Sequence, residues 1–392
     1  MKKYFFIILL GLIFTASCVF YVPYGEEAQP PEEEYYEEPS PGLDVSYFYD
    51  SLSPYGMWIY YPTYGYVWIP RDMPYAWRPY THGHWVWTDY GWTWRSQIVW
   101  GWAPFHYGRW GWERDIGWFW VPGAVWGPGW VTWRSSNIYI GWAPLPPGVP
   151  FVAGVGIRRV TYPIPASHWV FVDGNSFLNP SLHLYVFPYE RNITIVNYTV
   201  RQTNIYVRNN RVINEGIGID RVRRITKRNI SKYELKDTKK AELRRIEAGK
   251  LEVYRPKIKK NQVAKPKAVL RKQEAKERIS KARITSVEGR DVHRREVNLL
   301  ERSQQKEVKE LERKLEERKK SVRAPAEIRR IEREHKEKLI KLKKSHEAEK
   351  VKIIKRHKEE EEKVKEKESE EKKEPEKKKK PEKKKVKKKV KK

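Results

Sequence analysis

The feature that most constrains the fold of this chain is a recurring pair of aromatic residues separated by one residue. All but one of the 18 tryptophans lie between Trp58 and Trp142. In this stretch, one aromatic pair is followed by a short connection and then by a second pair. Side chains two residues apart project from the same face of a strand. Each unit therefore predicts a β-hairpin with its aromatic rings on one face.

Three copies of the unit align well, and together they contain Trp58, Trp68, Trp85, Trp87, Trp92, Trp94, Trp110, Trp112, Trp118 and Trp120. A looser fourth copy ends at Trp142. Gly65, Gly91 and Gly117 stand at the connections, where their backbone freedom favours a tight turn. The sequence therefore predicts a Trp-rich repeat domain of β-hairpins over residues 46–150.

Two interpretations of these indoles stay open. A Trp side chain buries roughly 150 to 250 Å², so the rings can form the core of thin sheets. Alternatively, some indole faces stay exposed and stack on sugar rings or on extended Pro-rich peptides. A small hairpin array has little interior, so we do not expect every ring to be buried. The ten tryptophans of the three clear copies are therefore the candidate aromatic ligand surface.

A resemblance to a known family rests on four segments between Leu52 and Pro147, namely PYGMWIYYP, GHWVWTDYGWTW, WGWAPFHYGRW and WVPGAVWGPGW. Together they resemble the uncharacterised Trp-rich repeat domain of exported bacterial proteins. The resemblance implies an exported protein with a β-rich repeat region. It implies no catalytic residues and no cofactor, and the basic C-terminal third of the chain departs from the family pattern.

The N-terminus resembles the signal peptide of a bacterial lipoprotein. Two lysines precede an apolar run, residues 4–16, which is too short to cross a hydrocarbon layer of roughly 30 Å as a helix. The run is followed by the sole cysteine, Cys18, in a lipobox-like sequence in which Thr15 stands where Leu is usual. An ordinary signal peptide and an uncleaved anchor stay open as alternatives. We expect residues 1–17 to be a lipoprotein-type signal peptide, Cys18 to be lipidated, and the exported chain to be anchored in the cell envelope.

The segments on either side of the Trp-rich region differ in composition. Residues 18–45 are acidic and rich in Pro, which predicts a linker. Residues 151–258 predict a second, small β-rich (α+β) domain with a type I′ turn at Asn209-Asn210. Its expected strands are His168–Val172, Leu182–Phe187, Ile193–Val200, Ile205–Ile213 and Lys250–Tyr254, with a short helix over Val222–Lys227 capped by Asp220.

Residues 259–365 predict a basic helical region with coiled-coil character. An apolar seam advances by three and four residues through Val297, Leu300, Gln304, Val308, Leu311 and Leu315. After Pro325 a second seam has weaker occupants, including His346 and Glu349. A folded-back helical pair or self-association is one arrangement. A single solvated helix stabilised by Glu-Lys pairs is the other.

The chain carries 80 Lys and Arg against 50 Asp and Glu, and only eight of the basic residues precede residue 151. Residues 366–392 predict a disordered Lys-rich tail, which would bind polyanions by releasing counterions. In an exported protein, the expected partners are anionic envelope polymers such as peptidoglycan, phosphorylated lipids or glycans, and nucleic acid is not expected. The lipid would add a membrane contact, and the helical region could self-associate. A solubilising tail without a dedicated partner stays open.

No catalytic signature is present in the sequence. A single Cys closes no intramolecular disulfide and supplies no zinc-cysteine site. His82, His84 and His106 have no carboxylate or Cys at ligand spacing, so we interpret them as packed side chains rather than metal ligands. We expect no cofactor and no enzymatic activity. The favoured interpretation is an envelope lipoprotein that tethers or organises envelope components, and the alternative is a glycan- or peptide-binding module that uses exposed Trp.

Overall fold

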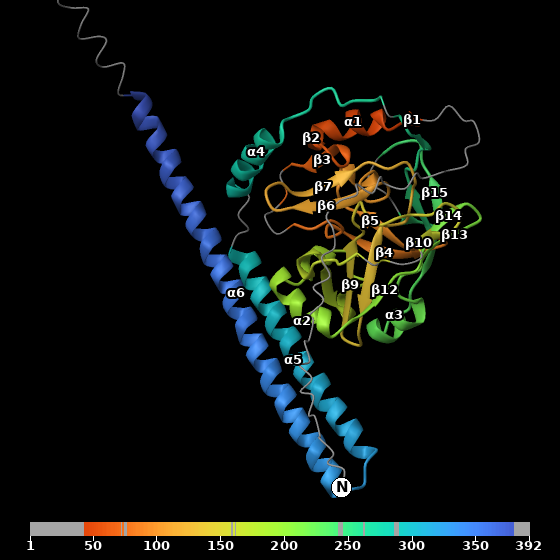
Figure 1. The fold of residues 1–392 in the computed structure, drawn as a ribbon, viewed down its shortest axis with the longest axis vertical. Coiled ribbons are helices and arrows are strands. Elements are labelled where there is room, and N and C mark those ends of the chain that lie inside the picture. Colours follow the sequence, from red (N-terminus) through yellow and green to blue (C-terminus); the bar gives the residue numbers. More distant parts are fainter. Residues whose placement is uncertain are drawn as a thin grey trace, which may run out of the picture. The chain divides into compact units, whose positions relative to one another are not determined.

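A computed structural model describes residues 43–71, 73, 77–157, 160, 162–241, 246–261, 263–285 and 290–379. Residues 43–260 form a β-rich head, and a helical arm follows it, as Figure 1 shows. The predicted fold class is therefore confirmed. The expected signal peptide, Cys18 and most of the acidic linker lie outside the described residues, as does the end of the chain from residue 380. None of the described helices is both long and apolar enough to cross a bilayer.

Four antiparallel hairpins form the predicted repeats. They pair β2 (Gly56–Tyr61) with β3 (Gly65–Pro70), β4 (Gly83–Thr88) with β5 (Gly91–Ser96), β6 (Arg109–Glu113) with β7 (Gly117–Val121), and β8 (Val131–Ser135) with β9 (Tyr139–Pro144). Tryptophans stand directly opposite one another in every hairpin, as in the pairs Trp85–Trp94 and Trp133–Trp142. The turn residue Gly91 has a φ of 77°, the left-handed conformation that favours glycine. The hairpins and their aromatic register are confirmed.

The strands that follow residue 150 are short. They are β10 (Gly156–Ile157), β11 (Val170–Asp173), β12 (Val200–Gln202), β13 (Ile205–Arg208), β14 (Arg211–Asn214), β15 (Lys232–Asp237), β16 (Ile246–Glu247), β17 (Lys250–Val253) and β18 (Ile258–Lys259). The strand β18 pairs in parallel with β1 (Leu43–Asp44). The predicted hairpin turn is confirmed, because Asn209 and Asn210 have φ values of 49° and 57° between β13 and β14. The strand predicted over 250–254 is present as β17, and the strand predicted over 168–172 is present as β11 but begins at Val170, because His168 belongs to a 3-10 turn.

The hairpins and the later strands share sheets. One four-stranded sheet has the order β2-β3-β7-β6, and another has the order β11-β9-β8-β12. The third sheet has eight strands in the order β10-β13-β14-β5-β4-β15-β17-β16. Strands from the predicted second domain therefore flank two of the Trp hairpins. The boundary predicted between residues 150 and 151 crosses these sheets.

Two predicted strands are wrong. Residues 182–187 contain a 3-10 turn, η5 (Leu182–Leu184), and only a bridge between Val186 and Val172. Residues 193–197 belong to the helix α2 (Asn192–Asn197), and β12 begins only at Val200. The helix occurs despite its branched residues because Asn192 donates its amide to the carbonyls of Ala166 and Trp169, at 2.8 and 2.6 Å. These tertiary bonds outweigh the intrinsic β propensity.

The remaining helical elements of the head are short. They are α1 (Ser46–Leu52), α3 (Ile219–Thr226), η1 (Ser53–Tyr55), η2 (Val99–Trp102), η3 (Ala166–His168), η4 (Gly174–Ser176) and η6 (Tyr189–Arg191). The helix α3 is the one predicted to begin at Val222, and it begins three residues earlier. Asp220 lies in its first turn rather than at the N-cap, which is Gly218.

The core of the head is aromatic. The largest fully buried side chains include Trp58, Trp68, Trp85, Trp92, Trp94, Trp110, Trp120, Trp133, Trp142 and Trp169. Many indole nitrogens donate to carbonyls, as Trp142 does to Tyr80 at 3.0 Å. The expectation that not every ring would be buried is confirmed, because Trp112 is exposed and Trp87 and Trp126 are partly buried. The other tryptophans of the array are buried. Most rings are buried because the segments after residue 150 cover the hairpins. Phe177, for example, packs against Trp92 with 5.0 Å between the ring centroids.

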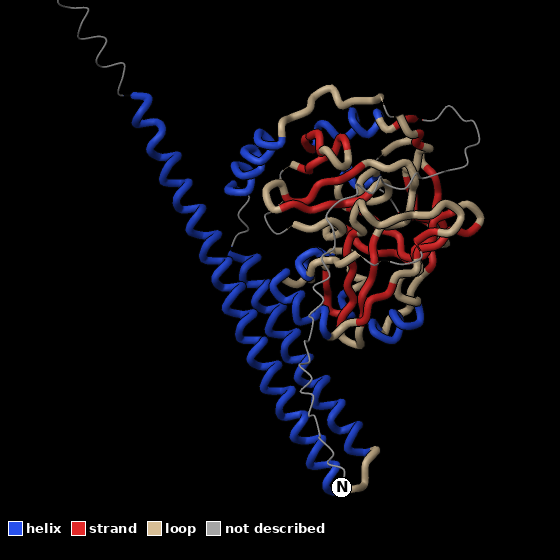
Figure 2. Tube along the Cα trace, viewed as in Figure 1, coloured by secondary structure: helices blue, strands red, loops and turns tan. Residues whose placement is uncertain are grey.

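The arm contains α4 (Lys272–Thr285), α5 (Arg290–Lys320) and α6 (Pro325–Lys379). Figure 2 shows α5 and α6 side by side, joined by the short turn before Pro325. Ion pairs such as Lys350–Glu301, at 3.0 Å, connect them. Of the two arrangements left open by the sequence, the folded-back pair is the one observed. The helix α6 continues to Lys379, past residue 366, where the sequence predicts the Lys-rich tail to begin.

Candidate functional site

A buried ion cluster attaches the arm to the head. Arg191, from η6, is fully buried, and its guanidinium lies 2.6 Å from Glu307 on α5 and 2.5 Å from Glu349 on α6. The phenol of Tyr139 donates to Glu307 at 2.9 Å. Burial acts to lower the pKa of Arg191, but Tyr139 and the two carboxylates outweigh it, so the pKa is raised. We call Arg191, Glu307, Glu349 and Tyr139 the Arg191 cluster.

The same carboxylate of Glu307 also bonds to the second helix. The Nε2 atom of His346 lies 2.7 Å from its Oε2 atom. Burial acts to raise the pKa of Glu307, but the bond to His346 and the charge of Arg191 outweigh this, so the pKa is lowered. Both His346 and Glu349 belong to the second seam that the sequence predicts. Their polar character at seam positions is the sequence signal for this ion cluster, because a polar residue that is buried at such a position needs a hydrogen-bonding partner.

A second ion cluster lies along the same junction. Arg356 on α6 is 2.6 Å from Glu190 of the head, 2.6 Å from Glu296 on α5 and 3.2 Å from Glu360. His357 bonds to Glu296 at 2.7 Å. This Arg356 cluster also joins the head, α5 and α6. Removing one partner from such a buried group leaves an uncompensated charge, which makes the arrangement specific for one docking geometry.

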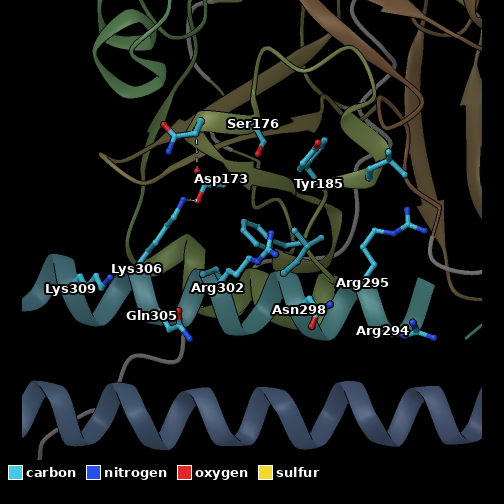
Figure 3. Close-up of a pocket in the computed structure, with 15 residues that line it drawn as sticks. Asp173, Ser176, Tyr185, Arg294, Arg295, Asn298, Arg302, Gln305, Lys306 and Lys309 are labelled. Atoms are coloured by element: carbon cyan, nitrogen blue, oxygen red, sulfur yellow. Dashed lines mark hydrogen bonds and ion pairs between the residues drawn. The ribbon is translucent and has the colours of Figure 1, made fainter. Parts of the chain in front are cut away.

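Between α5 and residues 173–187 of the head lies a cavity of about 670 Å³. We call it the basic chamber because five basic side chains and one acidic side chain line it. The acidic one is Asp173, and the basic ones are Arg294, Arg295, Arg302, Lys306 and Lys309. In Figure 3, Arg295 and Arg302 extend from α5 toward the segment that carries Tyr185, and Lys306 reaches Asp173 to form an ion pair.

Arg295 and Arg302 are two arginines of this chamber whose charge is not compensated by an ion pair with a described residue. Neither forms a hydrogen bond or ion pair with any residue that the structure describes. The neighbours of Arg302 one turn away on α5 are Asn298, Leu299, Gln305 and Lys306, none of which is acidic. The neighbours of Arg295 one turn toward the C-terminus are Asn298 and Leu299, and Asp291 lies one turn before it. Elsewhere on the same helix an arginine is paired within one turn, as Arg313 is with Glu310 at 2.7 Å. The side of α5 that faces the basic chamber therefore keeps an uncompensated positive charge.

A second cavity, of about 340 Å³, adjoins the basic chamber. It shares Leu184, Phe187, Arg295 and Leu299 with the basic chamber. At its head side the rings of His82 and His183 stack at 5.2 Å. Burial, assisted by the charge of His183, lowers the pKa of His82 to about 4, so this ring is neutral at pH 7. We call the two cavities together the α5 groove.

Most of the tryptophans that the sequence predicts as an aromatic ligand surface are buried. Eight of the ten are buried, Trp87 is partly buried, and Trp112 is 46% exposed. Trp112 lies beside His168, with 5.4 Å between the ring centroids. The buried rings are not accessible to a ligand, so Trp112 is the one of these ten tryptophans that presents a largely open ring.

The predicted interpretation of the histidines as packed side chains agrees with their surroundings. His106 lies against Trp126 with nearly parallel rings, and its Nδ1 is 2.8 Å from the carbonyl of Gly127. Burial, assisted by the charge of Arg95, lowers the pKa of His84 to about 4. Among the described residues, no three His, Cys, Asp or Glu side chains converge as metal ligands.

Comparison with known proteins supports one part of the resemblance. A family model described as a family of unknown function (DUF6600) matches residues 49–149. This range contains the four Trp hairpins and ends before the strands that cover them. No curated protein and no solved structure matches the chain. The α5 groove lies largely outside the family match.

Proposed function

We propose that this chain is a non-enzymatic envelope protein that tethers or organises anionic envelope components. In this proposal, a lipid on Cys18 attaches the chain to a membrane, and the basic arm binds peptidoglycan, phosphorylated lipids or anionic glycans. The observation that carries the proposal is the docking of α5 and α6 to the head through the Arg191 and Arg356 clusters. The buried clusters favour an arm attached to the head over a freely moving tail.

The exposed face of α6 supplies the cationic surface. Among the side chains of α6 that the structure describes, the solvent-exposed lysines are Lys336, Lys338, Lys341, Lys343, Lys344, Lys352, Lys355, Lys358 and Lys365. Clustered lysines on a helix attract anionic surfaces and polymers, and salt weakens this attraction by screening and by counterion competition. Export of the chain would place the anionic polymers of the envelope, rather than nucleic acid, within reach of this face.

The binding of isolated envelope material at increasing salt tests this proposal. We expect the triple variant Lys341→Gln, Lys344→Gln, Lys352→Gln to dissociate at lower salt than the unchanged protein. The matched control is Lys239→Gln, Lys250→Gln, Lys257→Gln, which removes three exposed lysines from the head. The control is expected to dissociate as the unchanged protein does. Equal shifts for the two triple variants would mean that only the net charge of the protein matters.

The membrane contact needs a separate test. Replacing Cys18→Ser removes the only thiol that can be lipidated. We expect this variant to lose hydrophobic partitioning into detergent, because several acyl chains provide a stable anchor. Unchanged partitioning would contradict lipidation at Cys18 and leave the arm as the remaining contact with the envelope.

A second candidate function is the recognition of a glycan or peptide through exposed Trp. One observation favours it, the exposure of Trp112 beside His168. A single open indole offers one stacking platform, which suits weak binding to one sugar ring. Quenching of fluorescence by a neutral oligosaccharide in the unchanged protein, and its loss in Trp112→Phe, would support this candidate.

A further inference from the structure

We infer that the α5 groove binds a short acidic oligosaccharide, a chain of sugar units that bears carboxylate or phosphate groups. This inference rests on the proposed function and names the ligand class for one defined site in it. The site comprises Arg295 and Arg302 on α5 and the facing segment 173–187 of the head. It differs from the lysine face of α6, which carries only diffuse charge.

The first argument is charge. Arg295 and Arg302 have no hydrogen-bond or ion-pair partner among the described residues, although the arm is rich in glutamate. A guanidinium binds carboxylate and phosphate through two parallel hydrogen bonds, and the bond is strong because both groups are charged. The two arginines are seven residues apart, which is two helical turns or about 10 Å along the axis. That separation suits anionic groups on a chain of sugars better than one small ion.

The second argument is the polar and apolar composition of the walls. Asn175, Ser176, Tyr185 and Asn298 line the basic chamber and can exchange hydrogen bonds with sugar hydroxyl groups. Leu184 and Phe187 provide apolar surface that sugar C–H groups can contact. A cavity of about 670 Å³ is within the usual size range for small-molecule sites. The adjoining chamber lengthens the site past Arg295, as an elongated ligand requires.

The third argument is that the walls are held in place before any ligand arrives. The carboxylate of Asp173 accepts a bond from the backbone N–H of Asn175 at 3.0 Å and also pairs with Lys306. Ser303, which also lines the basic chamber, accepts a bond from Arg191 at 3.2 Å and donates to the carbonyl of Leu300 at 2.8 Å. A preformed site loses less conformational entropy on binding, which favours affinity.

Isothermal titration calorimetry with the whole chain tests this inference. The probes are trigalacturonate, which bears carboxylates, and maltotriose 6-phosphate, which bears a phosphate, with neutral maltotriose and inorganic phosphate as references. We expect at least one acidic trisaccharide to bind more tightly than both references. The probe that binds more tightly distinguishes a carboxylated glycan from a phosphorylated sugar headgroup as the source.

Variants test the location of binding. Arg295→Gln and Arg302→Gln are each expected to weaken binding about tenfold, the effect of losing roughly 1.4 kcal/mol from a charged hydrogen bond. Arg333→Gln is the matched control, because Arg333 is an exposed arginine of α6 outside the groove. Asn298→Glu places a carboxylate in the groove without changing either arginine, and it should weaken binding as well. Urea unfolding of each variant establishes that it is folded.

Several results would overturn the inference. Equal weakening in Arg333→Gln and in the groove variants would show diffuse attraction by net charge. Inorganic phosphate that binds as tightly as the acidic sugars would indicate a simple anion site. If neither acidic trisaccharide binds, while envelope retention still depends on the lysines of α6, the groove inference fails and the proposed function stands.

Discussion

The guanidinium of Arg191 lies 2.6 Å from the carboxylate of Glu307, and both side chains are almost fully buried. The two residues come from different parts of the chain, since Arg191 belongs to a turn of the head and Glu307 to the long helix α5. Glu349 on α6 completes the contact. A basic arm that would otherwise be a solvated helix is therefore packed against a Trp-rich core through charged side chains.

The first prediction concerns this cluster. Arg191→Met should lower the free energy of unfolding by about 3 to 5 kcal/mol, because the carboxylates of Glu307 and Glu349 stay buried but lose the arginine that pairs with both. The measurement is urea unfolding at pH 7, followed by Trp fluorescence for the head and by far-ultraviolet circular dichroism for the helices. The fluorescence and helical transitions should separate in the variant if the arm detaches first.

Arg330→Met is the control for this substitution. Arg330 forms an ion pair with Glu327 at 3.2 Å on the exposed surface of α6, where such pairs contribute little. An unfolding curve for Arg191→Met that matches the curve for Arg330→Met would show that the Arg191 cluster does not hold the arm to the head.

The hairpins could be predicted from the sequence because their signal is local. A spacing of two places the rings on one face, and Gly91 at the turn favours the register that puts Trp85 opposite Trp94. The wrong predictions lie where contacts with residues distant in the sequence determine the local structure. Asn192–Asn197 has the branched composition of a strand, yet the bonds of Asn192 to Ala166 and Trp169 hold it as a helix.

The groove could not be predicted because its two walls are far apart in the sequence. Arg295 and Arg302 look like ordinary charges on a basic helix until α5 is placed against residues 173–187. Two sequence signals were present but weak. His346 and Glu349 occupy seam positions, and the residues one turn from Arg302 are not acidic. The seam positions predict a buried polar contact, and the lack of acidic neighbours predicts an unpaired charge on Arg302. Neither signal identifies the segment of the head that packs against α5.

The second prediction compares two tryptophans. Trp142 is fully buried and donates its indole N–H to the carbonyl of Tyr80 at 3.0 Å, whereas Trp112 is 46% exposed. Trp142→Ala should lower the free energy of unfolding by about 3 to 5 kcal/mol, the usual cost of removing a buried large ring. Trp112→Ala should cost much less. Chemical denaturation of both variants checks this, and similar losses would contradict the assignment of Trp142 to the core.

The third prediction is that residues 46–150 do not fold alone. Asn214, on β14, accepts a hydrogen bond from the indole of Trp133 at 3.0 Å and donates to the carbonyl of Gly129 at 2.8 Å. A chain that ends at residue 150 loses this residue and also the strands β11 and β12 that flank the fourth hairpin. We expect it to bind the dye ANS and to lack a near-ultraviolet circular dichroism signal.

A longer fragment, residues 43–260, serves as the comparison, because it contains every strand of the three sheets. It should show a near-ultraviolet signal, although it lacks the two glutamate partners of Arg191. A well-dispersed NMR spectrum from the fragment 46–150 would instead mean that the hairpins form an independent domain, as the sequence predicts.

The fourth prediction concerns pH and rests on His168. Its ring lies 4.9 Å from Trp118, and burial lowers its pKa to about 4. In the unfolded chain the pKa is about 6.5, so between these values the unfolded state takes up a proton that the native state does not. The contribution of the neutral His168 ring to the free energy of unfolding is therefore complete above about pH 6.5. It is lost as the pH falls toward 4, by up to about 3 kcal/mol.

His168→Gln removes this titration, so the variant should lose less stability than the unchanged protein between pH 7 and pH 4. The check is urea unfolding at several pH values, compared as the difference between the two proteins rather than as absolute stabilities. At pH 7 and above, that difference should be constant, because the histidine is neutral in both states. Parallel curves down to pH 4 would contradict a neutral, buried His168. The remaining acid sensitivity of the variant would then be assigned to other groups, such as His84 and the carboxylate of Glu307, whose pKa is lowered and whose contribution is lost only at more acidic pH.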